Sequence, residues 1–367
     1  MDNLKQPDID RPLVSVGILT YNHEKYIAEA IESVLKQKVN FKYEIVIAED
    51  CSTDNTRKIV IEYQKKYPDI IRLILQPHNM GIQKNSNILR RACRGIYRAN
   101  LEGDDYWAVE DKLQTQVDFL ENNSDFIAIG GDFRCIDDNG KPCKFPWGDI
   151  RYTYCQDTEY TKEHLKKWLL FGHTSTMCFR NIFYNCGEEV NNRFDNVQIL
   201  GDRRISLFLV MQGRVRHEKK IWVVRRVLSK SKTSMTNAVK QFNYIGVNYG
   251  WLCEAERYAK SEFGYNLDLS EIKEKRWIGS WKFFKRNPNK ENLKIIFFVF
   301  KNSNTKFKYI CILTKKVLNK LNENIKKQGI KRTLYKIFDF VVKSFRKKNN
   351  MTNQKDNKVL NSFSKNK

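Results

Sequence analysis

The order of apolar patterns in the N-terminal part of the chain predicts an α/β fold built on a doubly wound parallel sheet. Short runs rich in β-branched residues, which are typical of buried strands, alternate with segments whose apolar residues recur every three or four positions, which is typical of amphipathic helices. Each strand-like run ends in polar residues. One helix between successive strands is the connection that parallel pairing requires.

The expected elements begin as strand, helix, strand, helix, strand. The first run, residues 13–20, is apolar on both faces, as in a central parallel strand. Ser52, Thr53 or Asp54 is expected to cap the second helix. Up to residue 101 we expect strands over 13–20, 43–48, 70–75 and 97–101, and helices over 26–35, around 59–63 and over 82–93. Beyond it we expect a helix over 113–120, strands over 126–133, 174–179 and 215–227, and a helix that follows Gly201-Asp202 and ends at Gly213.

The positive charge of the chain is concentrated in its C-terminal quarter. Of the 66 Lys and Arg residues, 27 lie in residues 271–367, which hold only 6 of the 42 Asp and Glu residues. Such a segment indicates an anionic partner, either nucleic acid or a membrane surface.

The rest of the composition excludes several classes of protein. A hydrophobic content of 41% excludes wholesale disorder. Nine cysteines without a C-x-x-C pair indicate reduced thiols rather than disulfides or a zinc site. No apolar run reaches the roughly 20 residues of a spanning helix, and residues 1–7 contain no signal stretch, so we expect neither secretion nor a membrane span.

Polar clusters follow three of the expected strands. They are Thr20-Tyr21-Asn22, Glu49-Asp50 and Asp104-Asp105. Because ligands of such sheets bind beyond the carboxyl ends of the strands, we expect the three clusters to meet at one edge. The absence of a G-x-G-x-x-G segment after the first strand and of a Walker motif weighs against dinucleotide and P-loop chemistry.

The segment Glu102-Gly103-Asp104-Asp105 places three carboxylates within four residues. These groups repel one another, and a hard divalent cation with oxygen ligands, Mg²⁺ or Mn²⁺, would neutralise them. Such an ion takes one or two carboxylates plus phosphates, so a nucleoside diphosphate would complete its coordination. The alternative is a solvated acidic turn, but the position directly after a buried strand favours the metal.

Five segments in this order resemble the motifs of family 2 glycosyltransferases. They are VGILTYN (16–22), IESVLKQ (31–37), EDCSTDNT (49–56), NMG (79–81) and LEGDDYW (101–107). The resemblance extends over about residues 12–230. It implies a GT-A fold, a nucleotide-diphospho-sugar donor, a divalent metal and inversion at the anomeric carbon.

The resemblance also implies roles for individual residues. Asp50 would accept a hydrogen bond from the base, usually uracil, and Asp104 and Asp105 would hold the metal and the diphosphate. Gly81 would allow close backbone approach. Lys84 would reach a phosphate, with an ordinary surface lysine as the alternative. The full set expected to bind the nucleotide-sugar is Thr20, Tyr21, Glu24, Asp50, Gly81, Lys84 and Asp104.

Inverting transfer needs a base that takes the proton of the acceptor hydroxyl. The family places this carboxylate at the start of a helix after the acceptor-side strand, where this sequence has Asp202. N-capping of the same helix is the alternative role. His173, which could equally be a loop residue, and Trp107 are further expected contacts of the acceptor or the diphosphate.

One position departs from the family pattern. Many relatives carry a histidine after the last core strand that approaches the metal or diphosphate, whereas this chain has Leu228. Leucine cannot ligate a metal. We therefore expect that Arg226, Lys230 or Lys232 neutralises the diphosphate instead, or that metal affinity is weak.

Residues 330–348 predict a basic amphipathic helix. Apolar residues recur there at helical spacing, and lysines and arginines fill the positions between them. This pattern fits a helix in the interface of an anionic membrane, and docking on the protein body is the alternative. The sequence contains no recognisable nucleic-acid-binding module, so we do not expect a nucleic-acid partner.

Together these features predict five parts: an N-terminal tail (1–11), a GT-A glycosyltransferase domain (12–232), a helical extension (233–329), a basic helix (330–348) and a disordered tail (349–367). The functional hypothesis is a cytoplasmic enzyme, peripheral at the inner face of the plasma membrane. It would move a sugar from a UDP-like donor to a lipid-linked or polysaccharide acceptor in the synthesis of a cell-surface glycan such as a capsule. The alternative is a non-catalytic protein that binds nucleic acid or membrane through its basic C-terminus.

Overall fold

The computed structural model describes residues 11–144, 154–199, 201–228, 244–286, 294–295 and 298–299. The chain divides into two compact units. The first comprises residues up to Tyr244 together with Trp251–Ile272, and the second comprises Ile245–Gly250 and the residues from Lys273 on. The basic helix expected over 330–348, the tail over 349–367, and Lys230 and Lys232 lie outside the described residues.

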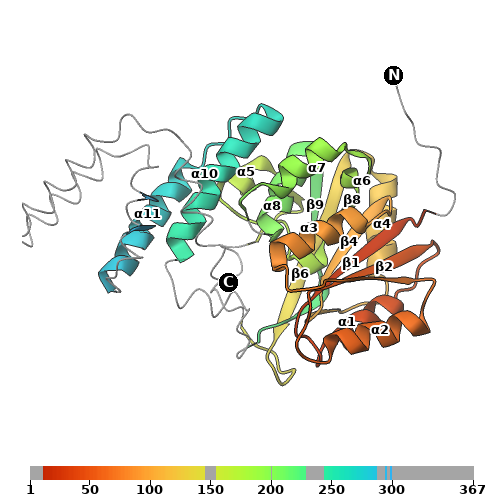
Figure 1. Ribbon diagram of the computed structural model, residues 1–367. Coiled ribbons are helices and arrows are strands. Elements are labelled where there is room, and N and C mark those ends of the chain that lie inside the picture. The colour runs from red at the N-terminus through yellow and green to blue at the C-terminus, as the bar shows by residue number, and fades with distance from the viewer. Residues whose placement is uncertain are drawn as a thin grey trace, which may run out of the picture. The chain divides into compact units, whose positions relative to one another are not determined.

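A nine-stranded sheet forms the middle of the first unit (Figure 1). Its strands lie in the order β3-β2-β1-β4-β8-β6-β9-β5, and β7 pairs with β9 off this path. Strands β3, β2, β1 and β4 are parallel to one another, which confirms the predicted β-α-β arrangement. Their bounds are Val14–Thr20 for β1, Tyr43–Glu49 for β2, Ile71–Leu75 for β3 and Tyr97–Glu102 for β4.

Helices cover both faces of these parallel strands (Figure 1). Alternate residues of β2 show the two sides: Ile45 and Ile47 belong to the main core, whereas Val46 and Ala48 pack with Leu89. The sheet is therefore buried on both faces, which is why its strands read as continuous apolar runs. The helices that connect the strands are α1 (Ile27–Leu35), α2 (Thr56–Lys66) and α3 (Ile82–Ala92). None of the three expected residues is the N-cap of α2: that position is Asn55, and Asp54 before it accepts the N–H of Thr56 at 2.9 Å.

The second half of the sheet is mixed. Strand β8 is antiparallel to both β4 and β6, β9 runs parallel to β6 with register shifts, and β5 and β7 are antiparallel to β9. The strands are β5 (Tyr106–Trp107), β6 (Phe126–Ile136), β7 (Glu159–Tyr160), β8 (Cys178–Arg180) and β9 (Arg214–Arg226). The helices are α4 (Lys112–Asn122), α5 (Lys162–Lys166), α6 (Ile182–Asn185), α7 (Glu188–Asp195) and α8 (Gly201–Gln212).

The strand predicted over 174–179 is wrong in its first half. Thr174–Thr176 form a 3-10 turn, and only Cys178–Arg180 pair as a strand. The side chains at the turn compete with strand pairing: His173 accepts the N–H of Ser175 at 3.4 Å, and the Thr176 hydroxyl donates to the His173 carbonyl at 2.7 Å. The run of β-branched and small polar residues therefore folds back on itself instead of extending.

Two further helices follow the sheet, α10 (Tyr244–Phe263) and α11 (Ser270–Arg286). The part of α10 that belongs to the first unit packs on α7 and α8: Glu262 pairs with Arg193 at 2.8 Å, and the Phe263 and Phe208 rings lie 5.8 Å apart. The expected domain boundary at residue 232 stays a prediction.

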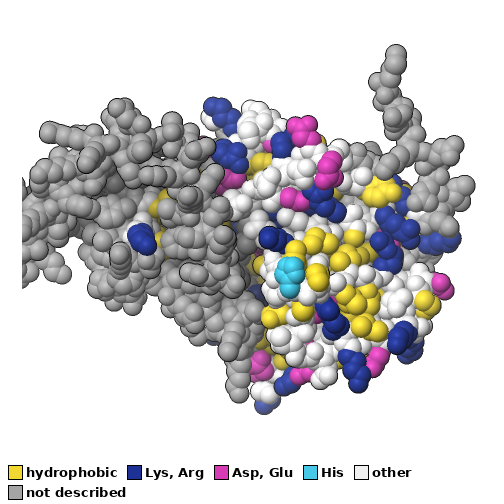
Figure 2. Space-filling view, in the orientation of Figure 1, with side chains coloured by type: hydrophobic (Ala, Val, Ile, Leu, Met, Phe, Trp, Pro, Cys, Tyr) yellow, Lys and Arg dark blue, Asp and Glu magenta, His cyan; other side chains and the backbone are white. Residues whose placement is uncertain are grey.

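Two further features of the described residues are the state of the cysteines and the distribution of apolar side chains on the surface. The eight cysteines within the described ranges are unpaired, as the sequence predicts. Figure 2 shows hydrophobic side chains gathered on one face of the α/β body with Lys and Arg around them. Among the large apolar residues with high exposure are Ile82 at 66% and Leu75 at 40%, which flank the turn between β3 and α3.

None of the helices described is long and apolar enough to cross a membrane.

Candidate active site

The three polar clusters meet at the carboxyl edge of β2, β1 and β4, as the sequence predicts. These three strands are neighbours, and their register places Thr20 opposite Glu49 and Leu19 opposite Glu102. The loops are also tied to one another beyond the strands: the Asp50 N–H donates to the Thr20 carbonyl at 3.1 Å, and the Gly103 N–H donates to the Leu19 carbonyl at 2.8 Å. The site is therefore built on the most regular part of the sheet.

Gly103 allows the acidic segment to lie directly against the end of β1. A Cβ atom at this position would lie 2.8 Å from the Thr20 hydroxyl and 2.9 Å from both His23 Nδ1 and the Leu19 carbonyl. No side chain fits this space without displacing the backbone. The position of Asp104, the next residue, depends on this close packing.

Asp50 holds the turn that begins α3. Its Oδ1 accepts the Met80 N–H at 2.7 Å, and its Oδ2 accepts the Gly81 N–H at 3.0 Å. Burial raises the pKa of Asp50, and these two amides oppose the shift. Gly81 has a φ of 79°, which favours glycine. Each carboxylate oxygen keeps a second lone pair, so this geometry leaves room for a hydrogen bond from a base.

The remaining residues expected around the nucleotide differ in their surroundings. Glu24 accepts the Asn55 backbone and side-chain N–H groups at 3.0 and 2.9 Å, so its carboxylate joins the β1 loop to α2. Lys84 is exposed on the first turn of α3. Tyr21 is half-buried directly after β1. The nucleotide roles of these residues stay predictions.

Asp104 and Asp105 have different environments. The Asp104 side chain is 21% exposed and lies 3.9 Å from His23 Nε2. Asp105 is 1% exposed, and its two oxygens accept the Arg226 N–H at 3.0 Å and the Ser175 hydroxyl at 3.2 Å. Asp105 therefore faces inward and fixes the segment, whereas Asp104 is accessible. The expectation that both carboxylates hold the metal stays a prediction.

Glu102, Asp105 and His173 form a compact cluster at the end of β4. Their ligand atoms all lie within 4.8 Å of one another. Burial and the neighbouring Asp104 raise the pKa of Glu102 to about 7. Burial, Asp104 and Glu102 likewise raise the pKa of Asp105 well above its ordinary range. Carboxylates that repel one another in this way fit a divalent cation, with Glu102 and Asp104 on the accessible side.

His173 is a buried neutral residue rather than a free ligand. It is 4% exposed, its Nδ1 accepts the Ser175 N–H, and its Nε2 lies 3.8 Å from Glu102. Burial, with Arg225 close by, holds the pKa of His173 well below its usual range. Because Nδ1 is an acceptor, the proton of the neutral ring lies on Nε2, the nitrogen nearer to Glu102.

Trp107 and Arg226 support the acidic segment from behind. Trp107 is 4% exposed and donates its indole N–H to the Ser175 carbonyl at 3.1 Å, so the expected contact of this ring with substrate does not fit its burial. Arg226 donates to the Asp104 carbonyl at 2.8 Å and pairs with Glu29. Its guanidinium is therefore engaged by protein groups, which leaves the expected neutralisation of a diphosphate by Arg226 without direct support.

Asp202 lies in the first turn of α8, as the sequence predicts. Burial raises its pKa, and the cations Arg203 and Arg225 oppose the shift. The negative charge of Asp202 in turn contributes to the raised pKa of Glu102. The two carboxylates are thus close enough to interact, which brings the start of α8 to the same site as the end of β4.

Arg225 is a functional candidate that the sequence reasoning missed. Although burial lowers its pKa, Tyr154, Asp105 and Glu102 raise the pKa of Arg225 above its ordinary value. Arg225 is half-buried, and its charge partly balances this acidic site. The sequence indicated its neighbour Arg226 instead. Because successive side chains of a strand point to opposite faces, only one of the two arginines can face the acidic site, and this alternation was the available signal.

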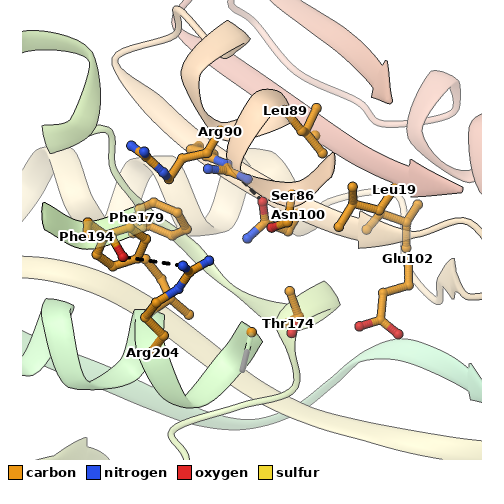
Figure 3. Close-up of a pocket in the computed structure, with 15 residues that line it drawn as sticks. Leu19, Ser86, Leu89, Arg90, Asn100, Glu102, Thr174, Phe179, Phe194 and Arg204 are labelled. Carbon is orange, nitrogen blue, oxygen red and sulfur yellow. Dashed lines mark hydrogen bonds between the residues drawn. The ribbon is translucent and has the colours of Figure 1, made fainter. Parts of the chain in front are cut away.

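A cavity lies beside this acidic site, between α3, β4 and α8 (Figure 3). Glu102 forms one side of it, and Arg204 with Phe194 forms the other, with Asn100 and Thr174 between them (Figure 3). Gly201, next to Asp202, also lines the cavity. The cavity therefore adjoins both carboxylate-bearing elements, whereas none of the residues expected to bind the nucleotide lines it.

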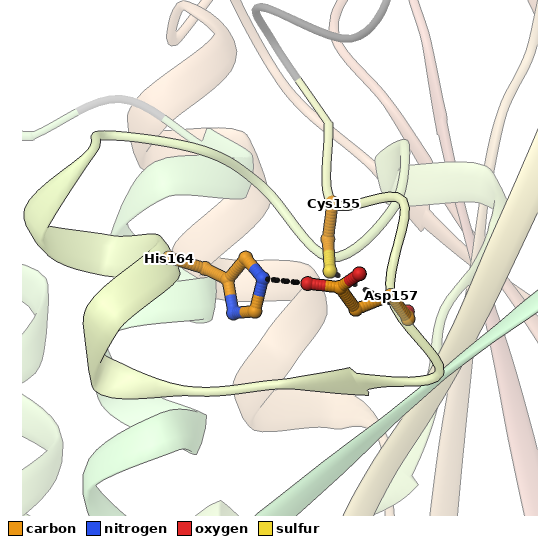
Figure 4. Close-up of side chains that lie close together, drawn as sticks. All are labelled: Cys155, Asp157 and His164. Carbon is orange, nitrogen blue, oxygen red and sulfur yellow. Dashed lines mark hydrogen bonds and ion pairs between the residues drawn. The ribbon is translucent and has the colours of Figure 1, made fainter.

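A second group of metal-ligating residue types, Cys155, Asp157 and His164, lies away from this edge (Figure 4). His164 Nδ1 accepts the Thr161 backbone N–H at 3.1 Å as part of a helix cap, and its Nε2 pairs with Asp157 at 2.8 Å. The neutral ring therefore carries its proton on Nε2, where a metal would have to bind. These hydrogen bonds explain the cluster as the cap of α5.

The comparisons with known proteins agree with this architecture. The crystal structure of S. aureus TarS residues 1–349 in complex with UDP-GlcNAc is similar with a TM-score of 0.56 and 17% identity, covering 78% of this chain and 79% of that one. The fold is therefore of the GT-A type. Residues 15–186 match the model of glycosyl transferase family 2, so the chain contains a family 2 glycosyltransferase domain.

Curated relatives share this domain. An uncharacterized protein of Mycobacterium tuberculosis is 38% identical over 134 residues, or 36% of this chain. Chondroitin synthase of Escherichia coli is 30% identical over 226 residues, or 61% of this chain. The matches span only 39% and 30% of the lengths of these two relatives.

Proposed function

We propose that this chain is an inverting glycosyltransferase that uses a divalent cation and a nucleotide-diphospho-sugar, with UDP as the nucleotide. The observation that carries the proposal is the arrangement of Glu102 and Asp104 at the end of β4 with Asp202 at the start of α8, close enough for the charge of Asp202 to act on Glu102. A donor diphosphate at Asp104 and a base at Asp202 would flank the reacting carbon. Inversion requires this placement, because the acceptor attacks opposite the leaving group.

The residues of the site divide the work of transfer. Asp202, whose pKa is raised by burial, accepts the proton of the attacking hydroxyl. Glu102 and Asp104 hold the cation, which when bound neutralises the charge of the leaving diphosphate. Asp105, Arg225 and the neutral His173 keep these carboxylates in place.

The pocket for the nucleotide base is the Asp50 edge of the site. Asp50 would accept a hydrogen bond from the base, and the exposed Leu75 and Ile82 offer apolar surface that a ring would cover. UDP is favoured because family 2 relatives usually bind uracil and because the similar TarS structure contains UDP-GlcNAc. Tyr21 and Lys84 would complete the contacts with ribose and phosphate.

The acceptor is proposed to be a hydroxyl of a polysaccharide or a lipid-linked glycan at the inner face of the plasma membrane. The similarity to chondroitin synthase supports a polysaccharide product. The basic segment over residues 330–348 supports attraction to an anionic membrane. Deletion of residues 330–367 should then release the chain from vesicles containing phosphatidylglycerol, and undiminished binding would place the membrane contact elsewhere.

Calorimetric titration with UDP, GDP and ADP, each with and without Mn²⁺, tests the donor site. We expect Mn²⁺-dependent binding of UDP that Asp104→Ala abolishes. Asp202→Asn should bind UDP as the wild type does but lose transfer by about a hundredfold or more. Asp118→Asn, a surface change on α4, is the matched control. Absence of nucleotide binding, or full transfer by Asp202→Asn, contradicts the proposal.

A further inference from the structure

We propose that the cavity between α3, β4 and α8 binds the carboxylate of an acidic donor sugar, so that the donor is a nucleotide-linked hexuronic acid rather than a neutral sugar. This inference rests on the function proposed above and adds the class of sugar to it. It is carried by the buried Arg98, whose terminal nitrogens have no partner among the described residues, and by the position of the cavity beside the reacting groups.

Arg98 is the central residue of the cavity. It is 5% exposed and lines the cavity from β4. Its Nε donates to Asn100 Oδ1 at 2.9 Å, and within the described part of the chain its two terminal nitrogens have no hydrogen-bond or ion-pair partner. A buried guanidinium with two free donors is costly unless a ligand completes it. Arg98 is therefore an unpartnered cation that lines an open cavity.

The neighbouring arginines add to the positive charge. Arg204 is 3% exposed and donates to the Phe194 carbonyl and to Asn87 Oδ1, but it forms no ion pair with any carboxylate of the described residues. Burial lowers the pKa of Arg204 to about 10 and lowers that of Arg98. Arg90 is paired with Asp195 at 2.8 Å. The charge of Asp195 acts on both Arg90 and Arg204, so among the described residues Arg98 is the guanidinium of the three without a carboxylate beside it.

The shape and lining of the cavity suit a carboxylate on a sugar ring. The cavity has a volume of about 60 Å³ and opens to solvent, which leaves room for a carboxylate group. Leu19, Leu89 and Phe179 line it together with the arginines, and such apolar walls strengthen a charge-assisted hydrogen bond by excluding water. A planar guanidinium binds a carboxylate through two parallel N–H···O bonds. Asn100 and Thr174 offer further polar groups for ring hydroxyls (Figure 3).

The location of the cavity assigns the carboxylate to the donor sugar. Arg98, Asn100 and Glu102 alternate along β4 and share one face of the sheet. The hydrogen bond from Arg98 to Asn100 holds the guanidinium on the face of β4 that ends at Glu102. The transferred sugar must lie between the diphosphate at Asp104 and the base at Asp202. A group on that sugar is therefore nearer to the cavity than a group on the acceptor.

Titration calorimetry with UDP, UDP-glucose and UDP-glucuronic acid, each with Mn²⁺, tests the inference. We expect the full chain to bind UDP-glucuronic acid about tenfold or more tightly than UDP-glucose, which differs only in the carboxylate. Arg98→Gln should remove this preference and leave the affinity for UDP within about twofold of the wild type. Arg72→Gln is the matched control, because Arg72 lies on β3 of the same sheet and is paired with Glu44.

Thermal unfolding separates a ligand-binding role of Arg98 from a structural one. Removal of an unpaired buried charge should leave the melting temperature of the ligand-free protein unchanged or raise it. A lower melting temperature together with lost UDP binding would make Arg98 a structural residue and overturn the inference. Arg98→Lys, which keeps the positive charge but not the two parallel N–H donors of the guanidinium, should retain part of the preference.

The remaining outcomes distinguish this inference from the proposed function. UDP binding without any preference for UDP-glucuronic acid overturns the inference and leaves the glycosyltransferase proposal in place. Failure to bind any of the three nucleotides contradicts both. Arg98-dependent binding of glucose 1-phosphate in the presence of saturating UDP, without a preference for the acidic donor, would assign the cavity to a phosphorylated acceptor and overturn the donor assignment.

Discussion

Substitution of Gly103 by alanine should disable the site while leaving the fold intact. The new Cβ would lie 2.8 Å from the Thr20 hydroxyl and 2.9 Å from the Leu19 carbonyl, whereas ordinary contact begins at 3.4 Å, so the segment must move by about 0.5–0.6 Å. The carbonyl belongs to the central strand β1 and cannot yield. Asp104, the next residue, must move instead. A displacement of this size at reacting groups lowers the rate by about ten- to a hundredfold.

The assay is the release of UDP from a UDP-sugar donor in the presence of Mn²⁺, measured together with the affinity for UDP. Gly187→Ala is the matched control, because a Cβ at Gly187 has no neighbour within 4 Å. We expect overpacking at Gly103→Ala to lower the free energy of unfolding by about 1–3 kcal/mol. Wild-type turnover and UDP affinity in Gly103→Ala would refute the argument that this close approach positions Asp104.

Three more changes probe the site and its support. Burial lowers the pKa of Lys112 to about 7, so its unfavourable charge is fully present below pH 7 and is relieved between pH 7 and the ordinary lysine pKa near 10.5. Between pH 7 and 9, the unfolding free energy of the wild type should therefore rise by about 2 kcal/mol more than that of Lys112→Met. Urea titrations at the two pH values measure this difference, and an equal rise in both proteins would contradict the prediction. Asp105→Asn should lower the unfolding free energy by about 1–3 kcal/mol, because one amide oxygen is left to accept from two donors, the Arg226 N–H and the Ser175 hydroxyl. Asp104→Asn should instead weaken Mn²⁺-dependent UDP binding at unchanged stability, and the reverse pattern would place the metal at Asp105. Gly81→Ala should cost about 1–2 kcal/mol because φ is 79°, and a melting temperature equal to that of the wild type would argue against a rigid turn there.

The parallel half of the fold could be predicted because its signals are local. Strands β1 to β4 are buried on both faces, and the helices between them show a regular apolar period. The predicted bounds therefore differ from the observed ones by at most one residue, except for α2, which was expected around 59–63 and spans Thr56–Lys66. The prediction failed where side chains compete with the backbone. Thr174–Thr176 read as a strand because two of the three residues are β-branched, but His173 and Thr176 close a turn that propensity alone does not reveal.

The site was predictable in its position and less so in its details. The carboxyl ends of neighbouring parallel strands must meet, so the convergence of Asp50, Asp104 and Thr20 follows from topology. Which of two adjacent acids faces solvent depends on partners far along the chain: Asp105 turns inward because Arg226 and Ser175 are there to bind it. No residue spacing in the sequence indicates such partners.

The contacts of Arg226 determine how much chain an active fragment must contain. The family model ends at residue 186, yet the amide and guanidinium that bind Asp105 and Asp104 belong to a strand that ends forty residues later, and Asp202 also lies beyond the match. A recombinant fragment cut at residue 186 would retain the whole acidic segment and lose the groups that hold it. The shortest fragment suitable for expression and crystallisation therefore extends at least to Leu228.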